Sequence, residues 1–269
     1  MAIKSKKESK SSNSGKAGSG NRRSISKGLL KEKAANELKA AQKGKRKVHA
    51  DILLEELLKS GCHFGHLVSK VNPRMQEYIF IARDGVHIFD LFKTKSQLEK
   101  AIDYLVKLTS SGGKIIFVGT KRQAVEAVKE TARKAGMFYV STRWIGGLLT
   151  NWKEVKKNLE RLEEINKELD QKDTTLTKYE LSVLKREKSR LEDLYRGLVG
   201  LEKLPECLFV VDIKREQTAI REARRMGIKI VGIADTNADP RLVDYVIPAN
   251  DDAQASIAYI LDKVAWAIK

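Results

Sequence analysis

The run Lys114-Ile115-Ile116-Phe117-Val118-Gly119 holds four successive large apolar residues between a lysine and a glycine. An amphipathic pattern follows over residues 121–135, and then a second apolar run, Met137-Phe138-Tyr139-Val140. An apolar run of this length is typical of a strand buried on both faces, whereas the pattern after it indicates a helix packed on a sheet. This order of elements predicts the start of a parallel α/β unit.

The same alternation returns near the C-terminus. Apolar runs at residues 207–211, 229–233 and 245–247 predict strands, and residues 216–226 and 251–268 predict helices. Short apolar strands that alternate with helices indicate a parallel sheet with helices on both faces, and we predict the α/β class.

The segment before this sheet has its own elements. Residues 52–61 predict a short amphipathic helix stopped by glycine, and residues 94–108 predict a longer helix. Between them, Asp84-Gly85 separates two apolar runs, which is a strong signal for a β-hairpin.

Residues 153–201 interrupt the α/β alternation. They are highly charged, and their apolar residues recur every three or four positions, from Val155 to Leu198. This period predicts two helices with a narrow apolar seam, and Thr177-Lys178-Tyr179-Glu180 fits a capping box that starts the second helix. We therefore predict an antiparallel coiled-coil helical hairpin over residues 153–201, inserted into a body that comprises residues 51–152 and 202–269.

The net charge of +17 is concentrated at the N-terminus. Residues 1–50 contain 15 Lys and Arg against 3 Asp and Glu, a net of +12, which leaves +5 for the remaining 219 residues. Residues 1–26 are mainly Ser, Gly, Lys and Asn, and we expect residues 1–50 to form a basic, disordered extension. The alternative for residues 28–47 is a weak helix on an RNA surface. The folded body must rely on local groups of cations if it binds a polyanion.

Composition also restricts the compartment. No run approaches the roughly 18 consecutive apolar residues of a membrane span, and the N-terminus lacks the apolar core of a secretory signal. Cys62 and Cys207 are far apart and form no CxxC pair, which fits a reducing compartment. An organellar transit peptide stays open at this point.

The turn Gly119-Thr120-Lys121-Arg122 follows a predicted strand, where backbone amides favour an anion. It matches neither GxGxxG nor GxxxxGK[ST], so we expect no free-nucleotide site there. Two readings remain: Lys121 and Arg122 contact an RNA phosphate, or they simply begin a solvated helix.

Two patterns suggest a metal site but are incomplete. Residues 235–239 begin like a calcium loop, but the following positions lack the required Gly and Glu, so turn chemistry explains them better. Cys62, His63 and His66 offer three ligands without a clear fourth. We expect His63 and His66 to hydrogen-bond within a glycine-shaped turn or to meet phosphates, and we predict no catalytic, cofactor-binding or metal-binding residues.

Residues 143–152, Arg-Trp-Ile-Gly-Gly-Leu-Leu-Thr-Asn-Trp, contain two of the three tryptophans of the chain. The glycine pair allows close backbone approach, Arg143 suits a phosphate, and the tryptophans offer stacking faces for bases. Alternatively, Trp144 and Trp152 pack the root of the hairpin against the body, and Asn151 caps its first helix. We favour this packing of the tryptophans because tryptophan is highly buried on average. Arg143 is then the expected RNA contact.

Several motifs, in order, resemble those of the bacterial form of the small-subunit ribosomal protein two family. They are Gly61-Cys62-His63-Phe64-Gly65-His66, Asn72-Pro73-Arg74-Met75, Phe117-Val118-Gly119-Thr120-Lys121, Arg143-Trp144-Ile145-Gly146-Gly147, Leu149-Thr150-Asn151-Trp152, Asp235-Thr236-Asn237-Ala238-Asp239-Pro240 and Pro248-Ala249-Asn250-Asp251-Asp252-Ala253. The similarity runs from about residue 53 to residue 267, and the basic extension is longer than the usual start of the family.

The resemblance implies a Rossmann-like three-layer αβα body with a protruding coiled coil. It also implies binding to small-subunit rRNA and anchoring of neighbouring ribosomal proteins, ribosomal protein one among them, without catalysis, cofactor, small-molecule substrate or membrane. We therefore predict a structural ribosomal protein, cytoplasmic unless the ribosome is organellar. The predicted RNA contacts are Lys70, Arg74, Lys121, Arg122 and Arg143. A nucleotide-dependent enzyme on the same sheet and a coiled-coil adaptor that uses the hairpin are the alternatives.

Overall fold

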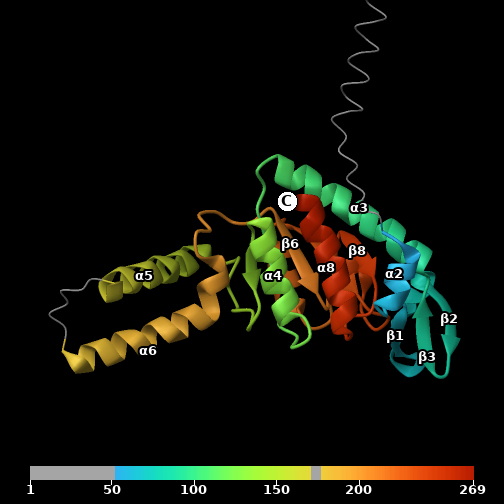
Figure 1. Ribbon diagram of the computed structural model, residues 1–269, viewed down its shortest axis with the longest axis horizontal. Helices are drawn as coiled ribbons and strands as arrows, with labels where there is room; N and C mark the ends of the chain where they lie inside the picture. Colours follow the sequence, from blue (N-terminus) through green and yellow to red (C-terminus); the bar gives the residue numbers. More distant parts are fainter. Residues whose placement is uncertain (1–51, 171–176) are drawn as a thin grey trace, which may run out of the picture. The chain divides into compact units, whose positions relative to one another are not determined.

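The computed structural model describes residues 52–170 and 177–269, so the predicted extension over residues 1–50 lies outside the described residues. Five parallel strands form the larger sheet in the order β5-β4-β6-β7-β8 (Figure 1). They are β4 (Ile115–Val118), β5 (Phe138–Val140), β6 (Cys207–Val211), β7 (Lys229–Ala234) and β8 (Tyr245–Pro248). The predicted α/β class with a parallel sheet is confirmed.

Each central strand is buried on both faces. On β4, Ile115 and Phe117 join one hydrophobic cluster, whereas Ile116 and Val118 join the other. Helices α3 (Leu91–Ser110), α4 (Val125–Ala135) and α8 (Gln254–Ile268) contribute to the first cluster. Helix α7 (Gln217–Arg225) and the loop that contains Leu148 contribute to the second. This two-sided burial explains why the strands are apolar at every position and not at alternate positions.

A smaller antiparallel sheet has the order β1-β3-β2 and follows the short helix α2 (Leu54–Lys59). Its strands are β1 (Phe64–Leu67), β2 (Ile79–Arg83) and β3 (Val86–Phe89). The predicted hairpin is confirmed, since Asp84 and Gly85 join β2 to β3 with positive φ angles of 52° and 78°. Strand β1 was not predicted, because the glycine-flanked Cys62–His66 motif has no strand periodicity and becomes extended only by pairing with β3.

Helices α5 (Trp152–Asp170) and α6 (Lys178–Tyr195) pack against each other. The Arg161 guanidinium on α5 donates two hydrogen bonds to the Glu187 carboxylate on α6, at 3.1 and 3.2 Å. The predicted capping box is confirmed, since Thr177 Oγ1 accepts a hydrogen bond from the Glu180 N–H and the Glu180 carboxylate accepts one from the Thr177 N–H. The coiled-coil character of the pair stays a prediction.

The short helices η1 (Val68–Lys70), η2 (Pro73–Tyr78), η3 (Arg196–Leu198) and η4 (Pro240–Leu242) connect these elements. Within residues 52–170 and 177–269, no helix combines the length and the apolar character that a bilayer span needs.

Candidate nucleic-acid interface

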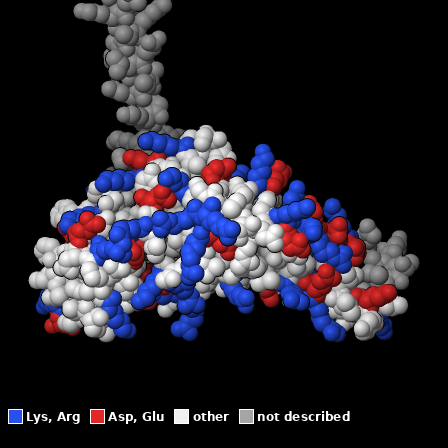
Figure 2. Space-filling model, turned by 180° about the vertical axis from the view of Figure 1, so that it is seen from behind, with Lys and Arg blue, Asp and Glu red and all other residues white. Residues whose placement is uncertain are grey.

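The surface of the body mixes charges of both signs. Figure 2 shows Lys and Arg side chains spread across one face of the molecule with Asp and Glu among them. This pattern agrees with the small net charge of the body in the sequence. RNA contacts therefore depend on local groups of cations, and a cation without a carboxylate partner offers its full charge to a phosphate.

Lys70 and Arg74 line the same hollow, which has a volume of about 460 Å³. Asn72 fixes the turn between them, because its Oδ1 accepts a hydrogen bond from the backbone N–H of Arg74 at 3.0 Å. One Arg74 nitrogen, Nη1, lies 2.5 Å from Asp239 Oδ2, so part of its charge is neutralised within the protein. The structure thus brings together two predicted RNA contacts that are close in sequence.

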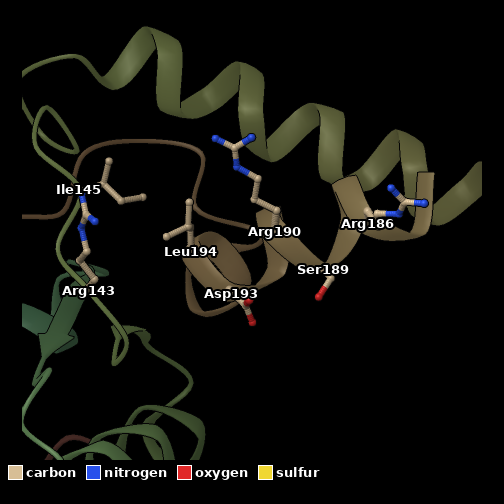
Figure 3. A pocket seen from close by; sticks show the side chains of 7 residues that line it. All are labelled: Arg143, Ile145, Arg186, Ser189, Arg190, Asp193 and Leu194. Carbon is tan, nitrogen blue, oxygen red and sulfur yellow. The ribbon is translucent and has the colours of Figure 1, made fainter. Parts of the chain in front are cut away.

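Arg143 borders a second and larger hollow, of about 600 Å³, together with Arg186 and Arg190 (Figure 3). Arg143 lies on the segment that follows β5, whereas Arg186 and Arg190 lie on α6. Arg186 and Arg190 were not predicted from the sequence, because a charged residue on an exposed helix face normally contacts only solvent. Their spacing of four residues, which places both on one face of α6, was the available signal.

The loop that carries Arg143 is fixed by a single carboxylate on α7. Glu222 accepts hydrogen bonds from the indole Nε1 of Trp144 at 3.1 Å and from the backbone N–H groups of Gly147 and Leu149 at 2.8 and 3.0 Å. It also accepts bonds from the N–H and the hydroxyl of Thr150, both at 3.3 Å. Burial opposes the charge, but these donors hold the pKa of Glu222 below its usual value.

The two tryptophans of this loop pack as expected. Trp144 is buried, with 8% of its surface exposed, and it belongs to the same hydrophobic cluster as Val155 and Leu159 at the start of α5. Trp152 is partly buried against that cluster. The preferred reading is therefore confirmed for the packing of the tryptophans at the root of α5 and α6. The predicted cap is not confirmed, since Asn151 bonds the first turn of α5 through its backbone oxygen and its side chain makes no hydrogen bond among the described residues.

Lys121 and Arg122 are adjacent in sequence but have different environments. The Lys121 ammonium lies 2.7 Å from Asp251, 2.5 Å from Asp252 and 3.5 Å from Asp212, and the residue is 9% exposed. Burial disfavours its charge, but the hydrogen bonds to Asp251 and Asp252 raise the pKa of Lys121 above its usual value. Arg122 is exposed. A phosphate that approaches this turn meets Arg122 directly, whereas it reaches Lys121 only by displacing a carboxylate.

The backbone and hydroxyl donors of the turn after β4 are already bonded to a carboxylate of the protein. Glu216 accepts hydrogen bonds from the backbone N–H of Thr120 at 3.1 Å and from its hydroxyl at 2.5 Å. Burial raises the pKa of Glu216. The predicted helix at Lys121 begins only at Val125, because residues 119–124 form the turn that brings Lys121 and Thr120 to these acidic partners.

The residues that could hold a metal are different from those suggested by the sequence. Among the described residues, His66, Asp235, Asp251 and Asp252 place one donor atom each within 4.8 Å of one another. The ammonium of Lys121 already pairs with two of these carboxylates, and His66 Nδ1 lies 3.0 Å from Asp235. The cluster is thus an ion-pair network in which Lys121 and His66 compensate only part of the carboxylate charge.

Cys62 and His63 lie outside that network. The Cys62 sulfur is buried and lies 3.2 Å from the hydroxyls of Ser60 and Ser256, and burial raises the pKa of its thiol. His63 Nδ1 is buried without a hydrogen-bond partner within the described part of the chain, and burial lowers the pKa of its imidazole. The expected hydrogen-bonding role thus holds for His66 but not for His63 Nδ1, and His66 lies on a strand and not in a turn.

Comparison with known proteins finds a matching family model and similar sequences. A family model described as "Ribosomal protein S2" matches residues 57–269. Over 220 residues, 81% of this chain, the sequence is 46% identical to a protein of Koribacter versatilis named "Small ribosomal subunit protein uS2", of which 73% is covered. A protein of Fusobacterium nucleatum with the same name is 44% identical over 220 residues, with 89% of it covered.

Proposed function

The chain belongs to the ribosomal protein S2 family, and on this premise we propose that it is a structural constituent of the small ribosomal subunit. In this role it binds small-subunit rRNA and helps to anchor neighbouring ribosomal proteins during translation. It acts in ribonucleoprotein, in the cytoplasm in the case of a bacterial ribosome. The role requires no catalytic step.

The main support for rRNA binding is the set of arginines around the larger hollow. Arg143, Arg186 and Arg190 have no carboxylate within ion-pair distance among residues 52–170 and 177–269. Unpaired guanidiniums gathered in one concavity are suited to phosphates, because each can donate two parallel hydrogen bonds to one phosphate group. Phosphate contacts of this kind release counterions and fix the position of a protein on RNA.

The proposed RNA contacts are those expected from the sequence: Lys70, Arg74, Lys121, Arg122 and Arg143. Lys70 and Arg74 act from their shared hollow, and Arg122 acts from an exposed turn. Lys121 requires a rearrangement of its carboxylate partners. The basic residues of the extension, residues 1–50, add long-range attraction through their charge.

An apolar surface on the smaller sheet suits a protein neighbour. Phe64 and Leu67 on β1 are each 50% exposed, and Phe80 and Ile81 on β2 are 74% and 52% exposed. Figure 2 shows few charged side chains at the end of the molecule that carries β1 to β3. Large exposed apolar side chains in one area are typical of interaction sites. We assign this surface to a neighbouring ribosomal protein, and ribosomal protein one is the proposed partner.

We propose a separate role for each part of the chain. Residues 51–152 and 202–269 form the rRNA-docking body, and residues 153–201 form a coiled-coil arm that fixes the register of the protein on the subunit. The ion pair between Arg161 and Glu187 and the packing of α5 on α6 support this assignment.

Filter binding to transcribed small-subunit rRNA, over a series of salt concentrations, tests the RNA-binding part. The proposed function predicts that the affinity falls steeply with salt, with a log–log slope of about −0.7 to −0.9 for each phosphate contact. An affinity for this rRNA no higher than for an unrelated RNA of equal length at every salt concentration would refute it.

A further inference from the structure

The larger hollow combines charged and apolar walls. The three guanidiniums of Arg143, Arg186 and Arg190 supply the charge, and the aliphatic side chains of Ile145 and Leu194 supply the apolar area (Figure 3). Its volume is about 600 Å³. A site with this composition is unlike a plain basic surface, which offers charge without an apolar wall.

The charge in this hollow is not compensated within the described part of the chain. Arg186 Nη2 donates to the Ser182 hydroxyl at 2.9 Å, which leaves most of its guanidinium N–H groups free. By contrast, Arg161 on α5 pairs with Glu187, and Lys188 on α6 and Arg196 on η3 pair with Glu192. Arg186 and Arg190, which border the same hollow as Arg143, are thus among the cations of α6 that lack acidic partners in the described part of the chain.

Asp193 also borders the hollow, but no carboxylate oxygen of it lies within 4.0 Å of a guanidinium nitrogen there. Its backbone oxygen instead accepts a hydrogen bond from the Thr142 hydroxyl at 2.7 Å. This bond ties the segment before Arg143 to α6. Because Glu222 binds the other side of the loop, the backbone that carries Arg143 is held on both sides.

We propose that this hollow binds an unstacked nucleotide of RNA. The guanidiniums pair with its flanking phosphates, and Ile145 and Leu194 lie against its base or ribose. Proteins recognise RNA mainly at loops and bulges, whose unstacked bases can leave the helix and enter a pocket. A continuous duplex offers no single base to the apolar wall and is too wide for a hollow of this volume. The inference rests on the proposed function and specifies a contact within it.

Charge-matched variants of the full chain test the electrostatic part. The double variant Arg186→Ala/Arg190→Ala removes two charges from the hollow, whereas Lys178→Ala/Lys185→Ala removes two exposed charges of α6 outside it. The probe is a labelled single-stranded RNA of 12 uridines, followed by fluorescence anisotropy. We expect the first variant to weaken binding about tenfold and to reduce the salt slope by about 1.4, which corresponds to two phosphate contacts on a single strand. The second should change affinity less than threefold. An equal loss in both variants would overturn the proposal, as would equal binding to a blunt RNA duplex.

Crosslinking from Ser189, which also borders the hollow, locates the ligand on the ribosome. The full chain carries p-benzoylphenylalanine at position 189, or at position 185 as the control, and is incorporated into small subunits before irradiation. Occupancy of the subunits together with an RNA crosslink specific to position 189, mapped to a loop or bulge, supports the proposal. Occupancy with a crosslink to protein, or with no crosslink, overturns the hollow as an RNA site and leaves the proposed function standing. A protein that does not enter small subunits overturns both.

Discussion

The carboxylate of Glu222 accepts a hydrogen bond from the indole Nε1 of Trp144 at 3.1 Å, across 78 residues of sequence. The same carboxylate receives the N–H groups of Gly147, Leu149 and Thr150. A buried carboxylate with this many donors organises the entire loop, because no other acceptor in the described structure serves these groups. One acidic residue on α7, Glu222, therefore holds the loop that contains the two tryptophans and two glycines.

Replacement of Glu222 tests this relationship. In Glu222→Gln, an amide NH₂ replaces one acceptor and faces backbone N–H donors, so we expect the free energy of unfolding to fall by about 2 kcal/mol. Urea denaturation followed by tryptophan fluorescence measures it. Glu202→Gln, at an exposed position, is the control and should leave the midpoint unchanged. Equal stability of both variants would show that the loop does not depend on this carboxylate.

Gly197 marks the point where the root of α6 touches the sheet. A Cβ at this position would lie 2.1 Å from the backbone oxygen of Tyr139, so Gly197→Ala forces η3 away from β5. We expect a loss of about 1–3 kcal/mol, as for other overpacked contacts. Gly146→Ala is the matched control, because its Cβ would meet nothing within 4 Å. A thermal melt that shows no difference between the two variants would contradict the contact.

The network around Lys121 predicts a dependence of stability on pH. The hydrogen bond to Asp235 raises the pKa of His66, so the stability it contributes is complete below about pH 6.5 and is lost as the pH rises through the higher folded-state value. Burial, with the nearby Asp212 and Asp235, raises the pKa of Asp251 to about 7, so the folded state binds more protons than the unfolded state between about pH 4 and 7. Both effects lower stability as the pH rises. The lowered pKa of His63 acts in the opposite direction.

His66→Gln isolates the histidine contribution. We expect the fall in melting temperature between pH 6 and pH 8 to be smaller in this variant than in the unmodified protein, because the variant no longer loses a proton at position 66 over this range. Differential scanning calorimetry in buffers of equal ionic strength measures the difference. An identical slope in the two proteins would show that the His66–Asp235 pair does not titrate with folding.

Arg143 should act in assembly and not in folding. Its side chain is exposed, so Arg143→Ala should leave the melting temperature within about 1 °C of the original value and weaken association with small subunits. Arg224→Ala, an exposed arginine on α7 that does not border the hollow, is the control. Competition between tagged variant and untagged protein for subunit occupancy measures the effect. Unchanged occupancy of the Arg143 variant would remove this residue from the interface.

The sequence predicted those parts of the fold that depend on local patterns. The apolar runs of β4 and β6, the Asp84-Gly85 turn and the Thr177–Glu180 capping box each have a local cause, and the structure contains all of them. Strand β1 could not be predicted in this way, because it becomes extended only through its partner β3.

The residues of the functional surface were harder to predict from the sequence. The sequence pattern places Lys121 as a cation at the start of a helix. Its environment is instead set by Asp251, 130 residues away, and by the adjacent Asp252. Arg186 and Arg190 read as solvated charges on α6, and they form a site only because the loop after β5 places Arg143 opposite them. The side chains of such a site are brought together by the tertiary fold, which local periodicity does not encode.

The most direct test of membership in the small subunit is sedimentation of the protein at its native level. A tagged copy is expressed from its own locus, the lysate is separated on a sucrose gradient, and the fractions are blotted at moderate and at high salt. The proposed function predicts that the protein migrates with small subunits at moderate salt and leaves them as salt rises, because phosphate contacts depend on released counterions. A signal that stays at the top of the gradient at every salt concentration would contradict it.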